Sequence, residues 1–222
     1  MPATEAEQAK PGRGRRKPNG DSASRQRVID AAISCILEQG LYRASSNAIA
    51  EQAGLSWGVI QYYFGTREAL MLAVLEEGAR RLEAAVQDAP ITGDTLTERV
   101  ASYMDILATY YGSPDYLAFI QVLMSLSHDP RVSETALSTL RRISEETSPP
   151  LRALQDHVLG DAVVRRPAIR SLLFHSLRGL GLSHAMLGAV PSNDIDPASR
   201  EFPEQRRLLA EAIALLIEKE SS

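Results

Sequence analysis

The chain of 222 residues has little cysteine, few aromatic residues and no long apolar run. Its single cysteine, Cys35, excludes an internal disulfide, and a lone thiol on an apolar face is more often an inert core residue than a redox centre. No apolar run approaches the roughly 20 residues that span a bilayer, and no signal-peptide core stands near the N-terminus. We therefore expect a cytosolic protein with no membrane segment.

The composition favours helices over strands. Aromatic residues make up 5% of the chain, Ala and Leu are frequent, and no long alternating run of Val, Ile and Thr is present. A hydrophobic content of 44% can fill a substantial core. The sequence therefore predicts an all-α protein with about nine helices.

Charge is distributed unevenly along the chain, although the net value is only −4. Residues 10 to 81 hold 11 Lys and Arg against 7 Asp and Glu, whereas residues 82 to 222 hold 13 against 19. A basic segment joined to an acidic one is typical of a phosphate-binding module attached to a module with another partner. Residues 1 to 23 have the composition of a disordered arm, and the basic run at 10 to 17 either contacts DNA or only adds solubility.

The most informative segment is 45–64, where the spacing of residues fits two short helices joined by a tight turn. Ala50 is small where two helices must cross, Gly54 stands where the turn needs positive φ, and Ile60 returns to the core. Ser56 is placed to cap the second helix with its side-chain oxygen. This pattern predicts a helix-turn-helix unit, which reads the major groove of DNA.

Other helices are predicted from apolar spacing, from caps at Thr66 and at Thr95 with Glu98, and from Pro114 as a first helical residue. Asp129 and Pro130 are expected to start a helix that Pro149 and Pro150 break or kink. The expected helices cover about 24–39, 46–53, 57–63, 66–88, 95–112, 114–127, 130–147, 167–188 and 203–219, and a further helical piece covers about 150–159.

The last two expected helices, 167–188 and 203–219, have wide apolar faces. Small residues in the first of them would let another helix approach closely. One apolar side can serve the domain core and the other a second subunit, which predicts a homodimer through a four-helix interface. The alternative is that all of these residues face a monomeric core.

A group of residues between 24 and 75 matches the pattern of a known family. Besides the first helix with its terminal Gly40, the match comprises Ile49, Ala50, Ala53, Gly54, Leu55, Ser56, Gly58, Ile60, Phe64 and the run Thr66, Arg67, Glu68, Ala69 and Leu70. In these residues the chain resembles the TetR family of bacterial transcriptional regulators. The resemblance implies a homodimeric regulator, most often a repressor, that leaves a palindromic operator in double-stranded DNA when a small molecule enters its C-terminal domain. We expect a basic arm at 1–23, a DNA-binding head at 24–70 and a helical ligand-binding and dimerisation domain at 71–222.

The resemblance also implies which side chains bind DNA. Hydroxyl groups at the start of the second helix contact phosphate or cap the helix, the next residue reaches a base edge, the third helix faces the groove, and a hydroxyl with a cation binds the backbone behind it. In that order the residues are Ser45, Ser46, Asn47, Ser56, Trp57, Gly58, Val59, Gln61, Tyr62, Tyr63, Thr66 and Arg67.

Two of these positions depart from the family pattern. Gln61 stands where Tyr is frequent, and Gln can form a bidentate contact with adenine, whereas Tyr mainly contacts phosphate. Trp57 stands where a basic or small polar residue is more usual. Its indole packs either on the DNA or on the surface of the head itself. Base preference is therefore expected to depend on this pair.

The C-terminal half is expected to enclose a mostly apolar pocket for a small-molecule effector. For each candidate lining residue the alternative is ordinary core packing. The candidates are Tyr103, Tyr110, Phe119, Leu123, Met124, His128, Phe174 and His175.

Motifs for catalysis, metal binding or cofactor binding are missing from the sequence. It contains no Glu-x-x-His pair, no His-Glu-x-x-His site and no Gly-rich phosphate loop after a strand. We therefore expect neither an enzyme nor a metal or cofactor. The alternatives to a ligand-released repressor are a ligand-dependent activator and a small-molecule carrier whose helix-turn-helix head is structural.

Overall fold

The computed structural model describes residues 18–87, 89–160, 166–187 and 202–221. Within these ranges the chain forms nine α-helices and no strand, which confirms the all-α prediction. The basic run at 10–17 and the loop at 191–197 lie outside them. The helices are α1 (Pro18–Gln39), α2 (Ser46–Ala53), α3 (Trp57–Phe64), α4 (Arg67–Val86), α5 (Leu96–Tyr111), α6 (Pro114–His128), α7 (Glu134–Leu159), α9 (Pro167–Leu187) and α10 (Phe202–Ser221).

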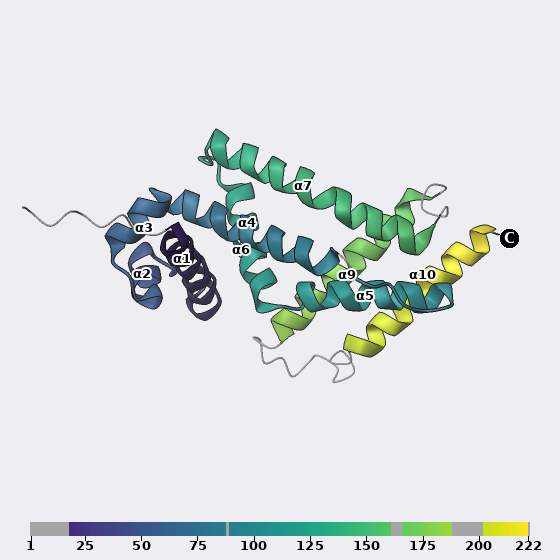
Figure 1. The fold of residues 1–222 in the computed structure, drawn as a ribbon. Helices are drawn as coiled ribbons and strands as arrows, with labels where there is room; N and C mark the ends of the chain where they lie inside the picture. Colours follow the sequence, from purple (N-terminus) through teal and green to yellow (C-terminus); the bar gives the residue numbers. More distant parts are fainter. Residues whose placement is uncertain (1–17, 88, 161–165, 188–201, 222) are drawn as a thin grey trace, which may run out of the picture.

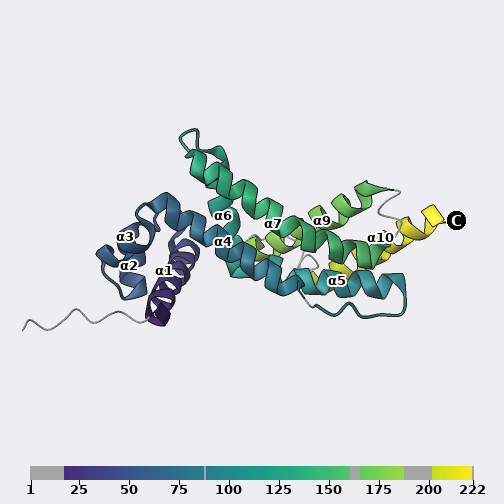
Figure 2. The same ribbon diagram turned by 45° about the horizontal axis from the view of Figure 1, so that its top comes forward.

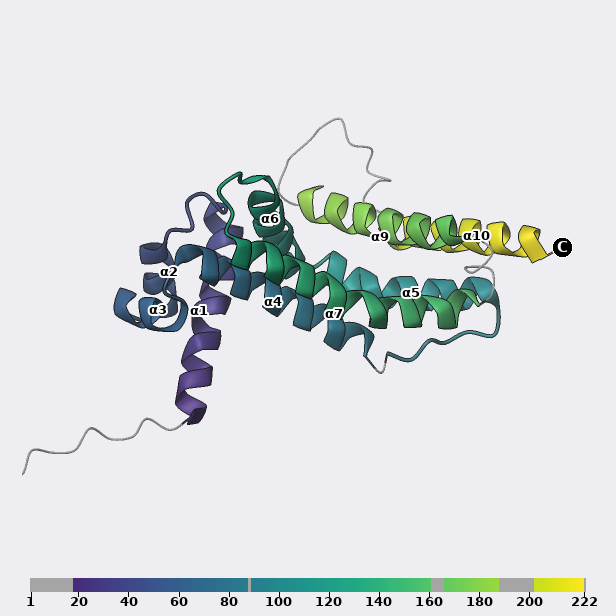
Figure 3. The ribbon, with the colours of Figure 1, turned by 90° about the horizontal axis from the view of Figure 1, so that it is seen from above.

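The helices form a small head and a larger body, which are joined along α4 (Figure 1). Helices α1, α2 and α3 make up the head at one end of the molecule, and α4 runs from the head into the body (Figure 2). In the body α4 packs on α5, α6 and α7. Helices α9 and α10 lie together along one side of the body, where both contact α5 (Figure 3).

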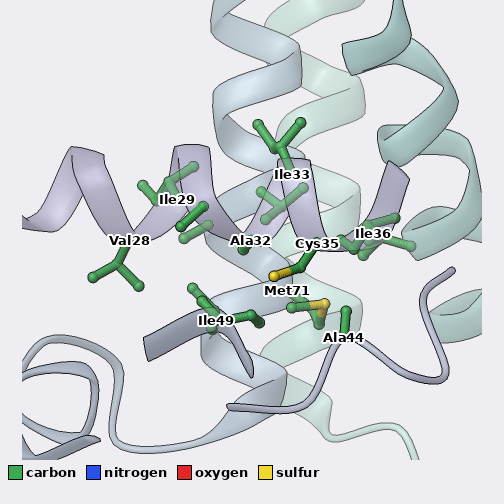
Figure 4. Packing of buried hydrophobic residues seen from close by; sticks show 14 of the residues in the cluster. Val28, Ile29, Ala32, Ile33, Cys35, Ile36, Ala44, Ile49 and Met71 are labelled. Atoms are coloured by element: carbon green, nitrogen blue, oxygen red, sulfur yellow. The ribbon is translucent and has the colours of Figure 1, made fainter. Parts of the chain in front are cut away.

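The core of the head is built on one face of α1 (Figure 4). Every third or fourth residue there is apolar, as a buried helix face requires, and these side chains pack against α2 and α4. Three small segments thus share a single core, which gives the helix-turn-helix a fixed frame. The labelled core side chains are Val28, Ile29, Ala32, Ile33, Cys35, Ile36, Ala44, Ile49 and Met71, none more than 6% exposed.

Helix α1 begins at Pro18, earlier than the predicted start at about residue 24. Proline is favoured at the first position of a helix, and Asp21 in the first turn is favoured by the helix dipole. The hydroxyl of Tyr63 in α3 also donates a hydrogen bond of 2.6 Å to the Asp21 carboxylate. Residues 18 to 23 were predicted to belong to the arm. They are helical because the first turn is favoured locally and is tied to α3 through the bond between Tyr63 and Asp21.

Most predicted helix caps are confirmed, and those at Ser56 and Asp129 are not. Thr95 and Glu98 form a complete capping box, Thr66 accepts the N–H of Ala69 at 3.0 Å, and Pro114 occupies the start of α6. Ser56 takes the N-cap position of α3 with extended backbone, but its side chain makes no capping hydrogen bond. The predicted cap at Ser56 is therefore wrong in this detail.

Helix α7 differs from the prediction at its start. It begins at Glu134 rather than at Pro130, and its N-cap is Ser133 rather than Asp129. The hydroxyl and the backbone N–H of Ser133 both donate to the carboxylate of Glu68 in α4, which fixes the cap against the body. Asp129 instead accepts the N–H of Arg131 at 2.9 Å, a local turn that competes with a helix start.

The predicted break at Pro149 and Pro150 is also wrong, because α7 continues through both residues. Each proline removes one backbone hydrogen bond to the residue four positions earlier. Those earlier residues, Glu145 and Glu146, are exposed, so water can bind their carbonyl groups. Buried side chains on either side of the prolines, at Ile143 and Leu151, hold the helix against the body.

The predicted close approach of a helix to the small residues of 167–188 occurs at Gly181. A Cβ atom at this position would lie 2.8 Å from the backbone of Tyr111. Only glycine therefore permits α9 to pack this closely on α5.

A charged cluster joins the head to the body. The guanidinium of Arg81 in α4 bonds Glu77 at 2.7 Å, Asp30 of α1 at 3.0 Å, and Asp115 of α6. Glu77 is only 5% exposed and also accepts a hydrogen bond of 2.7 Å from Arg80. The bond from Arg80, together with that from Arg81, holds the pKa of Glu77 below its ordinary value although burial opposes this. These five residues form the Arg81 cluster.

From the Arg81 cluster we predict that Glu77→Gln lowers the stability of the protein. The substitution removes the negative charge and turns one of the two acceptor oxygens into an NH₂ donor facing the arginines, so the free energy of unfolding should fall by about 2 kcal/mol at neutral pH. Because the pKa of Glu77 is lowered in the folded state, the loss should shrink as pH falls through that pKa. Urea unfolding of the wild type and the variant at several pH values measures this difference in the free energy of unfolding.

Glu76→Gln is the matched control for this prediction. Glu76 lies on the same helix, but it pairs with Arg142 at the surface, where both side chains are more than a third exposed. Such a pair contributes about 0–1 kcal/mol. Equal losses from the two substitutions would contradict a special role for the cluster.

Cys35 offers a test of the head core. The thiol is fully buried. Burial raises its pKa, and the negative charge of the nearby Glu38 carboxylate raises it further by a smaller amount. Native protein should react with iodoacetamide about a hundredfold more slowly than protein unfolded in urea, because the reaction requires opening of the core and formation of the thiolate. Similar rates in the two states, measured by mass spectrometry, would contradict the packing described for α1.

Candidate nucleic-acid interface and ligand cavity

The turn between α2 and α3 is fixed by backbone hydrogen bonds. Gly54 has φ +60°, donates to Glu51 at 2.9 Å, and is followed by Leu55, which donates to Ala50 at 3.0 Å. This pattern closes a helix with a left-handed residue that glycine adopts without strain. A side chain of α1 adds a further bond, since Arg27 donates to the carbonyl of Ala53 at 2.8 Å. The start of α3 is therefore set rigidly by α1 and α2.

Helix α3 buries a single side chain fully and presents one face outward. Ile60 is 2% exposed, whereas Trp57 is 43% and Tyr62 is 70% exposed. Gly58 and Gln61 are exposed as well. No acidic residue occurs between Glu51 and Glu68, so this surface does not repel phosphate. An exposed helix of this kind has the dimensions to enter the major groove.

Two other predicted recognition-helix residues are less exposed. Val59 is half-buried, and Tyr63 is half-buried with its hydroxyl bonded to Asp21. The ring of Tyr63 also makes edge contacts with Tyr62 and Phe64, at centroid distances of 5.1 and 6.3 Å. Tyr63 therefore positions α3 on α1, whatever contact it makes with DNA.

The start of α2 and the start of α4 carry the remaining predicted DNA contacts. Ser45 is exposed and accepts the N–H of Ala48 at 3.2 Å, Ser46 is half-buried, and Asn47 is exposed. Thr66 caps α4, and the exposed Arg67 donates to the carbonyl of Leu41 at 2.7 Å. Helix N-termini with capping hydroxyls suit phosphate, because free N–H groups and the helix dipole point toward the ligand.

The motif pattern did not single out two exposed residues beside this surface. Tyr42 is 98% exposed and Arg43 is exposed, both in the turn directly before Ser45. Their position in an α1–α2 turn was readable from the sequence, but nothing in the pattern distinguished them from ordinary surface residues.

The body contains a partly open cavity of about 320 Å³ between α4, α5, α6, α7 and α9, which we call the apolar chamber. Its lining is mostly aliphatic and aromatic, with a few hydroxyl groups and one arginine. The lining residues are Leu75, Ala79, Leu82, Tyr110, Tyr111, Tyr116, Phe119, Leu123, Leu140, Ile143, Ser144, Thr147, Ser148, Leu151, Phe174 and Arg178.

Four of the eight candidate pocket residues line this chamber, namely Tyr110, Phe119, Leu123 and Phe174. The others lie elsewhere. Tyr103 is buried in the body core, where its hydroxyl accepts a hydrogen bond from Gln155 at 2.9 Å. Met124 is 59% exposed, and the ring of His128 bonds the Met124 carbonyl at the end of α6. His175 lines a smaller cavity nearby.

Three aromatic hydroxyl groups and one guanidinium give the chamber its polar features. Burial raises the pKa of Tyr110, Tyr111 and Tyr116, so these phenols stay neutral at physiological pH. Tyr110 donates to the carbonyl of Gly78 at 2.9 Å, while Arg178 donates to the Tyr116 hydroxyl at 2.8 Å. Sequence reasoning missed Arg178, although it follows Phe174 by one helical turn and thus shares its face.

Within the described ranges, no group of three or more His, Cys, Asp or Glu side chains comes together in a way that could hold a metal ion. Among the described helices, none is long and apolar enough to span a bilayer.

Comparison with known proteins agrees with this geometry. Residues 28–74 match the family model "Bacterial regulatory proteins, tetR family". The chain is 27% identical over 136 residues to the HTH-type transcriptional regulator BetI of Vibrio campbellii, a match that covers 58% of this chain and 67% of that protein. Other curated regulators match over shorter stretches that span 32 to 44% of their own length.

Solved structures extend the likeness to the whole fold. A transcriptional regulator from Rhodococcus sp. Rha1 superposes with a TM-score of 0.65 at 20% identity, over 89% of this chain and 97% of that one. The multidrug binding protein EbrR, in complex with imidazole, superposes with a TM-score of 0.55 at 21% identity, over 85% and 93%. At these identities the likeness concerns the fold.

The match at the head, the rigid helix-turn-helix it covers and the shared fold of the body lead to one conclusion. The chain belongs to the tetR family of bacterial regulatory proteins.

Proposed function

We propose that the chain is a homodimeric repressor that leaves a palindromic operator when a small molecule occupies the apolar chamber. In this proposal residues 24–70 read DNA, and residues 71–222 bind the effector and form the dimer. The observation that carries the proposal is the exposed, acid-free surface of α3, held by α1 and α2 in a helix-turn-helix. The family to which the chain belongs supports it.

Gln61 is the proposed base reader of α3. It is exposed near the middle of the helix, next to Tyr62, and its amide can bond both N6 and N7 of adenine. Contacts from Ser45, Thr66 and Arg67 to the sugar-phosphate backbone of the DNA would set the register of α3 in the groove without reading the base sequence.

Gln61→Ala should weaken binding to the operator far more than binding to random duplex. A bidentate contact to a base discriminates by about 1–3 kcal/mol, so specific affinity should fall about tenfold or more while non-specific affinity stays unchanged. The operator is first selected from a random duplex library, and both affinities are then measured by fluorescence anisotropy over a range of salt concentrations.

Gln52→Ala is the matched control, because the Gln52 amide lies 3.5 Å from Glu38 on the α1 side of α2. It should leave both affinities unchanged. Equal losses of specific and non-specific binding in Gln61→Ala would exclude Gln61 as a base reader. A wild-type protein with no preference over random duplex and no salt dependence would favour a carrier with a structural head.

The dimer is proposed to form through α9 and α10. Exposed apolar side chains concentrate on these two helices, which lie on one side of the body (Figure 3). Large exposed apolar patches are rare on monomers and mark interaction surfaces. Pairing two copies through this face would place two heads on the two halves of a palindrome. The side chains are Leu172 (46% exposed), Met186 (51%), Leu208 (52%), Leu215 (66%) and Leu216 (37%).

Leu215→Glu should convert the dimer to a monomer at micromolar concentration. Burial of one leucine contributes about 1.5–3 kcal/mol, and the carboxylate adds a desolvation cost in each copy. Sedimentation velocity gives the mass, and the same sample should bind the full palindrome no better than a single half-site. Leu137→Glu in α7, a residue 39% exposed, is the control that should stay dimeric. A dimer that survives Leu215→Glu would locate the interface elsewhere.

Packing of the chamber suggests how occupancy would reach the head. Phe119 and Leu123 line the chamber and also pack against both the head core and the body core. A ligand that binds better when these side chains shift would favour one position of α4, and therefore one spacing of the heads. EbrR, of the same fold, is described in complexes with imidazole and with ethidium, which supports ligand binding in such a body.

A further inference from the structure

A second cavity adjoins the apolar chamber. It measures about 210 Å³, lies between α7 and α9, and shares Ser148, Leu151 and Phe174 with the apolar chamber. We call it the basic chamber. Because these three residues line both chambers, one elongated molecule can reach from the first chamber into the second.

Among the described residues, the charges that line the two chambers all have one sign. Arg152 and Arg170 line the basic chamber, and Arg178 lines the apolar chamber. No aspartate or glutamate of the described ranges belongs to either lining, although residues 82 to 222 carry an excess of acidic residues. Asp156 pairs with Arg170 from outside the lining. The two linings thus carry three guanidinium groups, and Arg170 is the one that pairs with Asp156.

The arginines retain unused capacity to donate hydrogen bonds. The Nε of Arg170 is buried and has no hydrogen-bond partner within the described part of the chain. Arg178 bonds a neutral phenol and stacks on Phe174 at 5.1 Å, and it pairs with no carboxylate of the described ranges. A buried donor with no acceptor is unfavourable unless a ligand supplies one.

We propose that the effector is an amphiphilic anion, with a hydrocarbon part in the apolar chamber and a carboxylate or phosphate group between Arg152 and Arg170. Gln155, Ser171 and His175 surround the anionic group in the basic chamber. Arg178, one helical turn from the shared Phe174, adds positive potential at the junction. A cationic ligand would be repelled, and a neutral one would leave the buried Nε of Arg170 unpaired. The identification as effector rests on the proposed function, whereas binding of such an anion does not.

The test compares ten-carbon ligands that differ only in their head group. Decanoate, decyl phosphate, decanol and decyltrimethylammonium are titrated below their micellar concentrations into the full chain by calorimetry, without DNA. At least one of the two anions should bind about tenfold or more tightly than decanol, as expected for charge-assisted hydrogen bonds. The ammonium should show no binding. The stronger of the two anions identifies the head group.

Arg170→Gln separates the anion site from the apolar chamber. It should weaken binding of the preferred anion about tenfold and leave decanol binding unchanged, so the ratio of the two affinities falls toward one. A misfolded variant would lose decanol binding too, and circular dichroism checks this. Arg131→Gln is the matched control, because Arg131 is 90% exposed in the segment between α6 and α7, away from both linings. It should change neither affinity.

Each outcome bears on one of the two proposals. Three results would overturn the anion site. Decanol or the ammonium could bind as tightly as both anions, neither anion could bind, or a folded Arg170→Gln protein could lose affinity for all ligands equally. Selective anion binding that leaves operator affinity unchanged would retain the site and overturn its role as effector site. A ligand-free wild-type protein that binds the operator no better than random duplex would instead overturn the proposed DNA-binding function.

Discussion

Helix α4 packs in two cores at once, and the position of the head depends on that packing. Its first half contributes Leu70, Met71, Val74 and Leu75 to the head core, and Val86 near its end belongs to the body core. A helix of this length is stiff over its few turns because each residue adds a backbone hydrogen bond. A change of packing at either end therefore alters the geometry at the other, with no need for a flexible hinge between them.

The Arg81 cluster adds a second connection, of a different physical kind. Apolar contacts tolerate small sliding motions, whereas Arg81 must satisfy Asp30, Glu77 and Asp115 on three helices at defined distances. Buried ion pairs are poor sources of net stability, since desolvation offsets much of their attraction. Their value here is in orientation, because the partly buried guanidinium ties α1 of the head to α6 of the body.

Local sequence signals predicted the fold and the helix-turn-helix of the head well. The spacing of Ala50, Gly54 and Ile60 was sufficient to place α2 and α3, because short-range turn chemistry decides that geometry. The start of α7 was not predictable, since Ser133 caps it through a contact with Glu68 from a distant helix. The cavity residues were half predictable: apolar periodicity identifies which residues are buried, but not which of them border empty space. Tyr103 fills the core and Arg178 lines a chamber for reasons set by tertiary packing.

The two prolines of α7 stand directly beside the chambers. Thr147, Ser148 and Leu151 line a chamber on either side of Pro149 and Pro150, where the helix lacks two of its backbone hydrogen bonds. Bending a helix at such a point costs less than bending it elsewhere. The wall that α7 provides is therefore mechanically more compliant at this turn than the walls formed by α4 and α5, which contain no proline.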